Sequence, residues 1–250
     1  MRKRLKSTVR YFLPHRVKRH RILAGPLQGC QIVTSWHDYP AAITGRTERS
    51  LLDWLTTNVK PGETWLDIGA HYGYTTIALC RLVGDQGRVF AFEPMISTAG
   101  FLNQTKILNK FHKMTVLPFA LGERKEINIG RLSVVRGMGD STLNGKKHET
   151  IFLTSLDWLW PQVCGQDRSI DGVKIDVQGM ELEVIKGMGE VVKSNKPKLV
   201  IEFHKGVDRN MMLNTLANIG YTRPANPIEP VSGEPPPQFL DDNSYAFEPN

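Results

Sequence analysis

The stretch Leu66-Asp67-Ile68-Gly69-Ala70-His71-Tyr72-Gly73 follows a short run of β-forming residues that begins at Thr64. Apolar residues recur at helical spacing directly after it, so the stretch is predicted to join a strand to a helix. Its two glycines let the backbone approach a ligand closely where a side chain would clash. Asp67 adds a hydrogen-bond acceptor at the strand end. We therefore predict the first β-α turn of an α/β sheet, with a ligand at that turn.

The same alternation of strand and helix continues along the chain. Strands are predicted over residues 64–68, 88–92, 114–121, 173–177 and 198–203, and helices over 47–58, around 77–82, over 97–110, over 180–192 and from 208 to before 220. The strands are almost continuously apolar, which is typical of a parallel sheet covered by helices on both faces. Short strands with a loop at 137–139 are predicted within residues 127–154.

Polar residues precede three of the predicted helices. Thr47, Ser97 and Asp208 each have a side chain that can accept a hydrogen bond from the first turn, so we expect them to be N-caps. The last of these helices should end before Gly220, because glycine commonly follows a helix.

The positive charge of the chain is concentrated at its start. The 250 residues include 32 Lys and Arg against 25 Asp and Glu, but no acidic residue precedes Asp38 and nine basic residues do. The rest of the chain is therefore close to neutral, which argues against a domain that binds nucleic acid specifically. No apolar run reaches the roughly 18 residues of a transmembrane helix.

These patterns divide the chain into a basic leader over residues 1–37, an α/β domain over 38–222 and a Pro-rich segment over 223–250, which can close the sheet with a strand at 244–247. Residues 1–21 are basic and in part amphipathic, so we expect either weak contact with an anionic membrane surface or a solvated arm packed on the domain. Three cysteines without a C-x-x-C pair, and no cleavable signal, favour a cytoplasmic protein, with the membrane surface as a peripheral location.

An acidic residue ends the second predicted strand. Glu93 lies 20 residues after Gly73, where a carboxylate can bind the two hydroxyls of a ribose. The glycine pair is spaced G-x-x-x-G rather than G-x-G-x-x-G, which argues against a nicotinamide dinucleotide. An adenosine-type ligand that bears an amine suits Asp67 and Glu93 together, and S-adenosylmethionine fits this description.

Seven collinear motifs between about residues 23 and 221 give the chain a resemblance to the FkbM family of S-adenosylmethionine-dependent methyltransferases. They are Gly45-Arg-Thr-Glu48, LDIGAHYGYTT at 66–76, VFAFEP at 89–94, FALG at 119–122, TSLD at 154–157, VKIDVQGMELEVIKG at 173–187 and PKLVIEF at 197–203. The resemblance implies the Rossmann-like seven-stranded methyltransferase fold, a mostly parallel sheet with one reversed strand. It also implies mainly O-methylation of hydroxyl groups.

The resemblance also implies roles for individual residues. The cofactor contacts would be made by Glu48, Asp67, Gly69, His71, Gly73, Tyr74, Glu93 and Ala120, and the signature at Asp176, Gly179 and Glu181 matches one that often reads D-x-E-G-x-E. The chain departs from the common pattern at His71, where Asn is usual, and at Gln178, where Glu is usual. Gln178 removes a carboxylate that could act as a base or hold a metal, so we expect no metal.

The last strand supplies the predicted base. Side chains alternate along a strand, so Glu202 and His204 should point to the same side. His204 is predicted to take the proton of the acceptor hydroxyl, because an ordinary imidazole has a pKa of about 6.5. Glu202 would orient it, and Asp176 is the rival base.

The sequence therefore predicts an S-adenosylmethionine-dependent O-methyltransferase that acts on a hydroxyl group of a small molecule, sugar or natural product. The first alternative is a non-enzymatic membrane-surface or binding module with a decayed site, and the second is a nicotinamide-dependent dehydrogenase. The retained Asp67, Gly69, Gly73 and Glu93 argue against decay.

Overall fold

The strand that begins at Thr64 lies at the centre of the main sheet. The structure, a computed structural model, describes residues 13–135, 138–140, 148–164, 169–229 and 239–250. β3 (Thr64–Ile68) pairs in parallel with β4 (Arg88–Phe92) on one side and with β10 (Gly172–Ile175) on the other. Every residue of β3 after Thr64 is buried, as the apolar pattern predicts for a strand covered on both faces.

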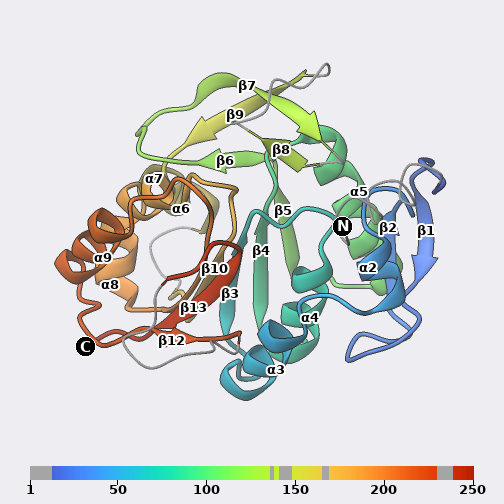
Figure 1. Ribbon diagram of the computed structural model, residues 1–250, viewed down its shortest axis with the longest axis horizontal. Helices are drawn as coiled ribbons and strands as arrows, with labels where there is room; N and C mark the ends of the chain where they lie inside the picture. The colour runs from blue at the N-terminus through green and yellow to red at the C-terminus, as the bar shows by residue number, and fades with distance from the viewer. Residues whose placement is uncertain (1–12, 136–137, 141–147, 165–168, 230–238) are drawn as a thin grey trace.

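The main sheet has seven strands in the order β12-β13-β11-β10-β3-β4-β5, as Figure 1 shows. Its other strands are β5 (Met114–Leu117), β11 (Lys198–Phe203), β12 (Asn226–Pro227) and β13 (Asn243–Phe247). Strands β11, β10, β3, β4 and β5 are parallel, and β13 runs antiparallel to β11. The predicted fold, with one reversed strand and a closing strand near the C-terminus, is confirmed. Strand order reverses between β3 and β10, where such sheets bind ligands.

Helices cover both faces of this sheet. α3 (Arg49–Asn58), α4 (Tyr74–Val83) and α5 (Ile96–Asn109) bury one set of apolar side chains, which includes Leu51, Leu79 and Leu102. α6 (Leu156–Cys164), α7 (Glu181–Lys186), α8 (Gly189–Asn195) and α9 (Arg209–Asn218) bury another, which includes Leu182 and Leu216. A short helix, α2 (Pro40–Thr44), precedes α3.

A β-ribbon precedes the domain. β1 (Lys18–Arg21) pairs antiparallel with β2 (Gln31–Thr34), and Gln31 exchanges two hydrogen bonds with Asn109 of α5, at 2.8 and 2.7 Å. The sequence did not predict this ribbon. Residues 1–12 lie outside the described residues, so the membrane contact of residues 1–21 stays a prediction. In the part of the chain that the structure describes, no helix is long and apolar enough to cross a membrane.

A second sheet lies above the C-terminal ends of the main strands in Figure 1. It contains β6 (Phe119–Leu121), β7 (Asn128–Val135), β8 (Met138–Asp140) and β9 (His148–Thr154), in the order β6-β9-β7-β8. The single strand predicted over 114–121 is wrong, because Pro118 separates β5 from β6 and has no N–H to continue a ladder. The loop predicted at 137–139 is wrong at 138–139, which belong to β8, and residue 137 lies outside the described residues.

The helix predicted over residues 180–192 is also divided, into α7 and α8. Gly187 ends α7, and a Cβ at this position would lie 1.8 Å from the carbonyl oxygen of Gly122. The chain therefore turns where glycine permits this close approach.

One of the three predicted caps is confirmed. The Asp208 side chain accepts a hydrogen bond from the N–H of Met211 at 3.0 Å. The cap predictions for Thr47 and Ser97 are wrong, since α3 and α5 begin after Glu48 and Met95 and neither N-cap residue makes a side-chain cap bond. Thr47 and Ser97 instead donate to the carboxylates of other residues.

Because β10 pairs with β3, Gly172 packs against Trp65 and has no room for a side chain. A Cβ there would lie 2.3 Å from the ring of the fully buried Trp65, so Gly172→Ala should lower the free energy of unfolding by about 1–3 kcal/mol. Urea denaturation measures this change. In the matched variant Gly100→Ala, on α5, the new methyl group meets open space, and stability should rise by about 0.4–1 kcal/mol. Equal midpoints for the two variants would contradict the packing seen here.

Candidate active site

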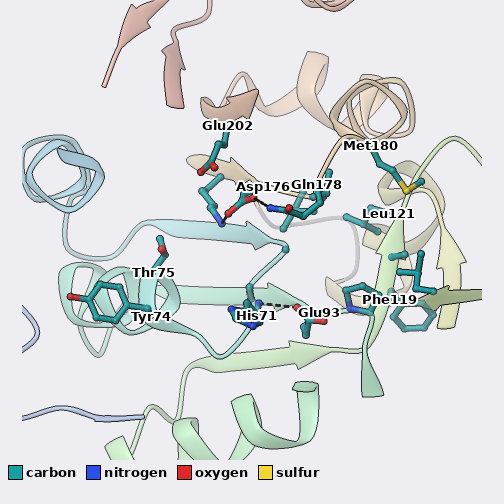
Figure 2. A pocket seen from close by; sticks show the side chains of 18 of the residues that line it. His71, Tyr74, Thr75, Glu93, Phe119, Leu121, Asp176, Gln178, Met180 and Glu202 are labelled. Atoms are coloured by element: carbon teal, nitrogen blue, oxygen red, sulfur yellow. Dashed lines mark hydrogen bonds and ion pairs between the residues drawn. The ribbon is translucent and has the colours of Figure 1, made fainter. Parts of the chain in front are cut away.

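A cavity of about 310 Å³ lies at the C-terminal ends of the central strands, and Figure 2 shows its side chains. β3, β4, β10 and β11 contribute the residues at their ends, and the second sheet forms part of the wall. Its lining includes Asp38, Tyr39, Glu48, Gly69, His71, Tyr74, Glu93, Ala120, Leu132, Lys174, Asp176, Gln178 and Glu202. The cavity therefore lies at the edge where the sequence predicts the ligand.

The loop after β3 passes close to β10. Gly69 has a φ of 84°, and a Cβ at this position would lie 1.8 Å from the carbonyl oxygen of Asp176. His71 also has a left-handed backbone, with a φ of 51°. Its N–H donates to Oε2 of Glu93 at 2.8 Å, as Figure 2 shows. The loop is thus fixed by backbone contacts, and its backbone borders the cavity.

Glu93 is 4% exposed and lies at the floor of the cavity. Its Oε1 accepts from the N–H of Met95 at 3.0 Å, while Oε2 accepts from His71. Burial raises the pKa of Glu93 to about 7, although both N–H groups favour the charged form. Each carboxylate oxygen has a further lone pair, so Glu93 can still accept hydrogen bonds from a ligand.

One end of the cavity is apolar. Phe119, Ala120 and Leu121 of β6 line it together with Leu132 of β7 and Met180. In Figure 2 Phe119, Leu121 and Met180 lie on the side away from Glu202. The cavity therefore has an apolar end and an acidic end, and a flat heterocycle would suit the apolar end.

A buried ammonium group separates two carboxylates at the acidic end. Lys174 of β10 is 5% exposed, and its Nζ lies 3.2 Å from Oδ2 of Asp176 and 3.4 Å from Oδ1 of Asp67. Burial alone would lower the pKa of Lys174, but the charges of Asp176 and Asp67 outweigh it and raise that pKa. Lys174 in turn holds the pKa of Asp176 below its ordinary value, against the effect of burial. Asp176 is therefore an ionised partner of Lys174.

His204 lies behind the cavity wall rather than in it. Its ring is 7% exposed, and Nδ1 lies 2.8 Å from Oε1 of the fully buried Glu181. Nε2 lies 3.4 Å from Glu202 and 2.9 Å from the amide of Gln178. Burial would lower the pKa of His204, but Glu181 and Glu202 raise it to about 10. The Gln178 atom that faces His204 is its amide nitrogen, which also donates to Oδ1 of Asp176 at 3.4 Å.

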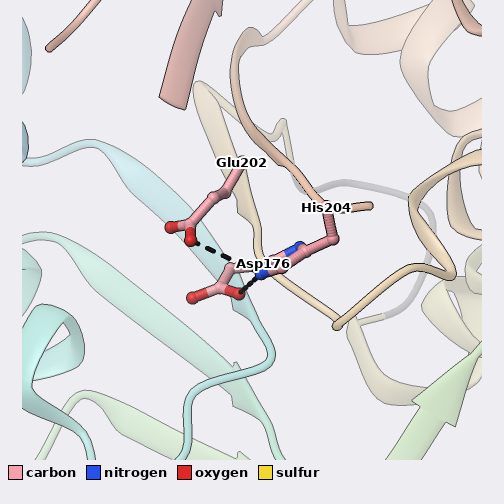
Figure 3. A group of neighbouring side chains, drawn as sticks. All are labelled: Asp176, Glu202 and His204. Atoms are coloured by element: carbon pink, nitrogen blue, oxygen red, sulfur yellow. Dashed lines mark ion pairs between the residues drawn. The ribbon is translucent and has the colours of Figure 1, made fainter. Parts of the chain in front are cut away.

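Figure 3 shows that Asp176, Glu202 and His204 come together, with ligand atoms within 4.8 Å of one another. Two carboxylates and an imidazole are chemically suited to a divalent cation. In the structure, however, Nδ1 of His204 contacts Glu181, its Nε2 lies 3.4 Å from Glu202, and Asp176 is paired with Lys174. These contacts favour an ion-paired cluster.

Glu48 reaches the same end of the cavity from the segment before β3. Its backbone is left-handed, with a φ of 53°, a strained conformation for a residue other than glycine. Thr47 Oγ1 donates to Glu48 Oε1 at 3.2 Å. Burial and the neighbouring charge of Glu202 raise the pKa of Glu48 to about 7.

The structure brings most of the predicted site residues to one cavity. Those that line it are Glu48, Gly69, His71, Tyr74, Glu93, Ala120, Asp176 and Glu202, whereas Asp67, Gly73 and His204 do not. Asp67 is fully buried, with Oδ2 accepting from Thr76 at 2.6 Å. Glu202 and His204 do point to the same side of β11, as predicted. The cofactor and catalytic roles of all these residues stay predictions.

Sequence reasoning missed Lys174 and Tyr39. A lysine inside the otherwise apolar run Gly172–Ile175 is the signal that could have revealed Lys174, because a buried lysine needs a carboxylate partner. No comparable signal marks Tyr39, whose place in the cavity depends on how the segment before α2 packs.

Comparisons with known proteins show a family match for this chain. The methyltransferase FkbM domain matches residues 67–222. The hexuronic acid methyltransferase AglP of Haloferax volcanii is 28% identical over 166 residues, which are 65% of this chain and 65% of that protein. The chain thus matches just under two thirds of the length of this relative.

Two solved structures are similar in fold. The methyltransferase FkbM of Methylobacillus flagellatus KT has 18% identity and a TM-score of 0.50, over 84% of this chain and 54% of that one. An S-adenosylmethionine-dependent O-methyltransferase of Thermotoga maritima has 15% identity and a TM-score of 0.48, over 82% and 66%. The first of these supports the methyltransferase fold.

The contacts of His204 predict a pH dependence of stability. Its pKa in the folded protein, about 10, is above the unfolded value of about 6.5. The contribution of His204 to the free energy of unfolding is therefore fully present below about pH 6.5 and is lost as the pH rises through about 10. The difference in urea midpoint between wild type and His204→Gln should be large near pH 6 and should shrink steadily by about pH 9.5. A difference that does not change with pH would show that His204 is neutral in the folded protein.

Proposed function

Because the chain belongs to the FkbM methyltransferase family, whose cofactor is S-adenosylmethionine, we propose that it transfers a methyl group to a hydroxyl group of a sugar or another small molecule. The observation that carries this proposal is the pairing of an apolar end and an acidic end in one cavity. The likeness to a hexuronic acid methyltransferase supports a sugar as the acceptor class.

The residues at the cavity fit the cofactor. Gly69 leaves its side of the loop without a side chain, and Glu93 retains acceptor capacity for the hydroxyls of a ribose. Ala120, Leu121 and Leu132 offer apolar contact for an adenine. When bound, S-adenosylmethionine supplies a methyl group that is activated by attachment to a sulfonium.

The acidic end suits a neutral acceptor that donates hydrogen bonds. Glu48, Asp176 and Glu202 line it with Lys174 as the cation that bonds to Asp176. Carboxylates accept hydrogen bonds from hydroxyl groups, and a carboxylate can take up a proton as the oxygen reacts. Holding the acceptor oxygen in line with the methyl group is the main task of the protein in such a displacement.

Methyl transfer is tested with S-adenosylmethionine labelled in its methyl group. The purified protein is incubated with an extract of its source organism and with a panel of neutral sugars and sugar acids. Label should move to an acceptor, and the product should resist alkali, because a methyl ether survives conditions that hydrolyse a methyl ester. Cofactor binding without any transfer would contradict the proposed activity. Label that alkali releases would show that the acceptor group is a carboxylate rather than a hydroxyl.

Glu93 should be a cofactor residue. Glu93→Ala removes an acceptor of charge-assisted hydrogen bonds, typically worth about 1.5–3 kcal/mol, so the Kd for S-adenosylmethionine should rise roughly tenfold to hundredfold. Calorimetric titration measures the change. Glu190→Ala, at an exposed residue of α8 outside the cavity, is the control and should bind normally. A folded Glu93→Ala protein with unchanged affinity would remove Glu93 from the cofactor site.

A further inference from the structure

Most of the carboxylates that line the cavity already have strong partners. Glu93 accepts from two backbone N–H groups. Asp38 accepts from the Tyr72 hydroxyl at 2.9 Å and lies 3.0 Å from Nδ1 of His37. These contacts hold the two carboxylates in place and favour their charged forms, although burial still raises the pKa of Glu93 to about 7. Glu93 is set apart from the acceptor by its proposed role toward the cofactor ribose.

The two carboxylates at the strand ends are paired with cations. Asp176 lies 3.2 Å from the ammonium group of Lys174, and Glu202 lies 3.4 Å from Nε2 of His204. A carboxylate that is bound to a cation gives up that attraction when it takes a proton. Taking a proton would cost each residue its ion pair, although burial and the charge of Asp176 raise the pKa of Glu202.

Glu48 differs from these four carboxylates. Among the described residues, its hydrogen-bond partner is the neutral hydroxyl of Thr47, and no cation lies within ion-pair distance of it. At least one carboxylate oxygen thus remains available to a molecule in the cavity. Glu48 therefore lies on the cavity wall as a carboxylate that no described cation neutralises.

The backbone fixes the direction of this side chain. Glu48 is the N-cap residue of α3, yet its side chain makes no cap bond and lines the cavity instead. The preceding turn is held at Gly45, where a Cβ would lie 1.8 Å from the carbonyl oxygen of Ala24. The left-handed backbone of Glu48 is the kind of local strain that clusters at functional sites.

Two neighbours lie beside Glu48. Thr47 donates to its Oε1 at 3.2 Å, and Tyr39 lines the same cavity. Burial and the charge of Glu48 raise the pKa of Tyr39, so this phenol keeps its proton. The charged groups that face Glu48 from the strands are Glu202, Lys174 and Asp176, and burial together with Glu202 brings its pKa to about 7.

We propose that Glu48 is the general base for the acceptor hydroxyl and that Thr47 is its positioning residue. This inference rests on the proposed function. The acceptor oxygen forms its bond to the methyl carbon and gives its proton to Glu48, while the electron pair of the broken carbon–sulfur bond stays on the sulfur of S-adenosylhomocysteine. Glu48 is then a catalytic residue, not the cofactor contact implied by the family resemblance.

The test separates the base from a cofactor contact. Glu48→Gln keeps the shape of the side chain and removes the base, so methyl transfer from labelled S-adenosylmethionine to the extract should fall roughly 10²–10⁴-fold. The Kd for S-adenosylmethionine, measured by calorimetry, should stay within about twofold. A tenfold weaker Kd with Glu48→Gln, or transfer within a few-fold of wild type, would overturn the proposal. Glu190→Gln is the matched exposed control and should leave both values unchanged.

A pH profile tests the base and its positioning residue, Thr47. Wild-type transfer should rise with pH through about 7, and Glu48→Gln should lack this limb. Thr47→Val removes a hydrogen bond that favours the charged carboxylate, so the limb should move to higher pH. Carbon NMR of labelled glutamate should show the side-chain carboxyls of Glu93 and Glu48 both titrating near pH 7, and the signal that Glu48→Gln removes is that of Glu48; a Glu48 that titrates near 4.5 would overturn the proposal. Wild-type protein that binds the cofactor but transfers no label would instead refute the proposed function.

Discussion

The ammonium group of Lys174 is the constraint on which the site depends. Lys174 and Asp67 are register partners on β10 and β3, so their side chains meet at the point where the strand order reverses. The carboxylate of Asp67 can be buried there, beside that of the partly exposed Asp176, because one cation lies between them. Removing one partner of a buried ion pair typically costs about 3–5 kcal/mol, since a charge is left without compensation. The same contacts tie the start of α4 to the sheet, because Asp67 also binds Thr76.

The distribution of positive charge explains why the remaining carboxylates differ. Lys174 forms ion pairs with Asp67 and Asp176, and His204 pairs with Glu181 and Glu202. Glu48 has no ion-pair partner among the described side chains, and its pKa rises to about 7. Groups whose environments push their pKa values apart are often those that divide the work of a site. In this cavity Asp176, whose pKa is lowered beside Lys174, holds geometry, whereas Glu48 is the carboxylate we propose as the base.

The sequence predicted the fold better than it predicted local contacts. β3, β4 and β11 begin and end where their apolar runs do, because a strand buried on both faces is specified by its own composition. The caps at Thr47 and Ser97 failed because their hydroxyls bind Glu48 and Glu149, and such tertiary partners leave no local signal. The same distinction between local pattern and tertiary contact applies to the residues of the site. Glu93 was predictable from its place at a strand end, whereas Lys174 and Tyr39 depend on register and packing.

The two departures from the usual family pattern both fall at left-handed backbone positions. His71 and Gln178 have φ values of 51° and 58°, a conformation that costs residues other than glycine roughly 1–3 kcal/mol. Each is held by contacts to the site: the His71 N–H binds Glu93, and the Gln178 amide binds His204. A glutamate at 178 would place another negative charge beside Asp176 and Glu202. The neutral amide there limits like-charge repulsion at the acidic end, so the substitution and the ion-paired state of His204 belong to one electrostatic arrangement.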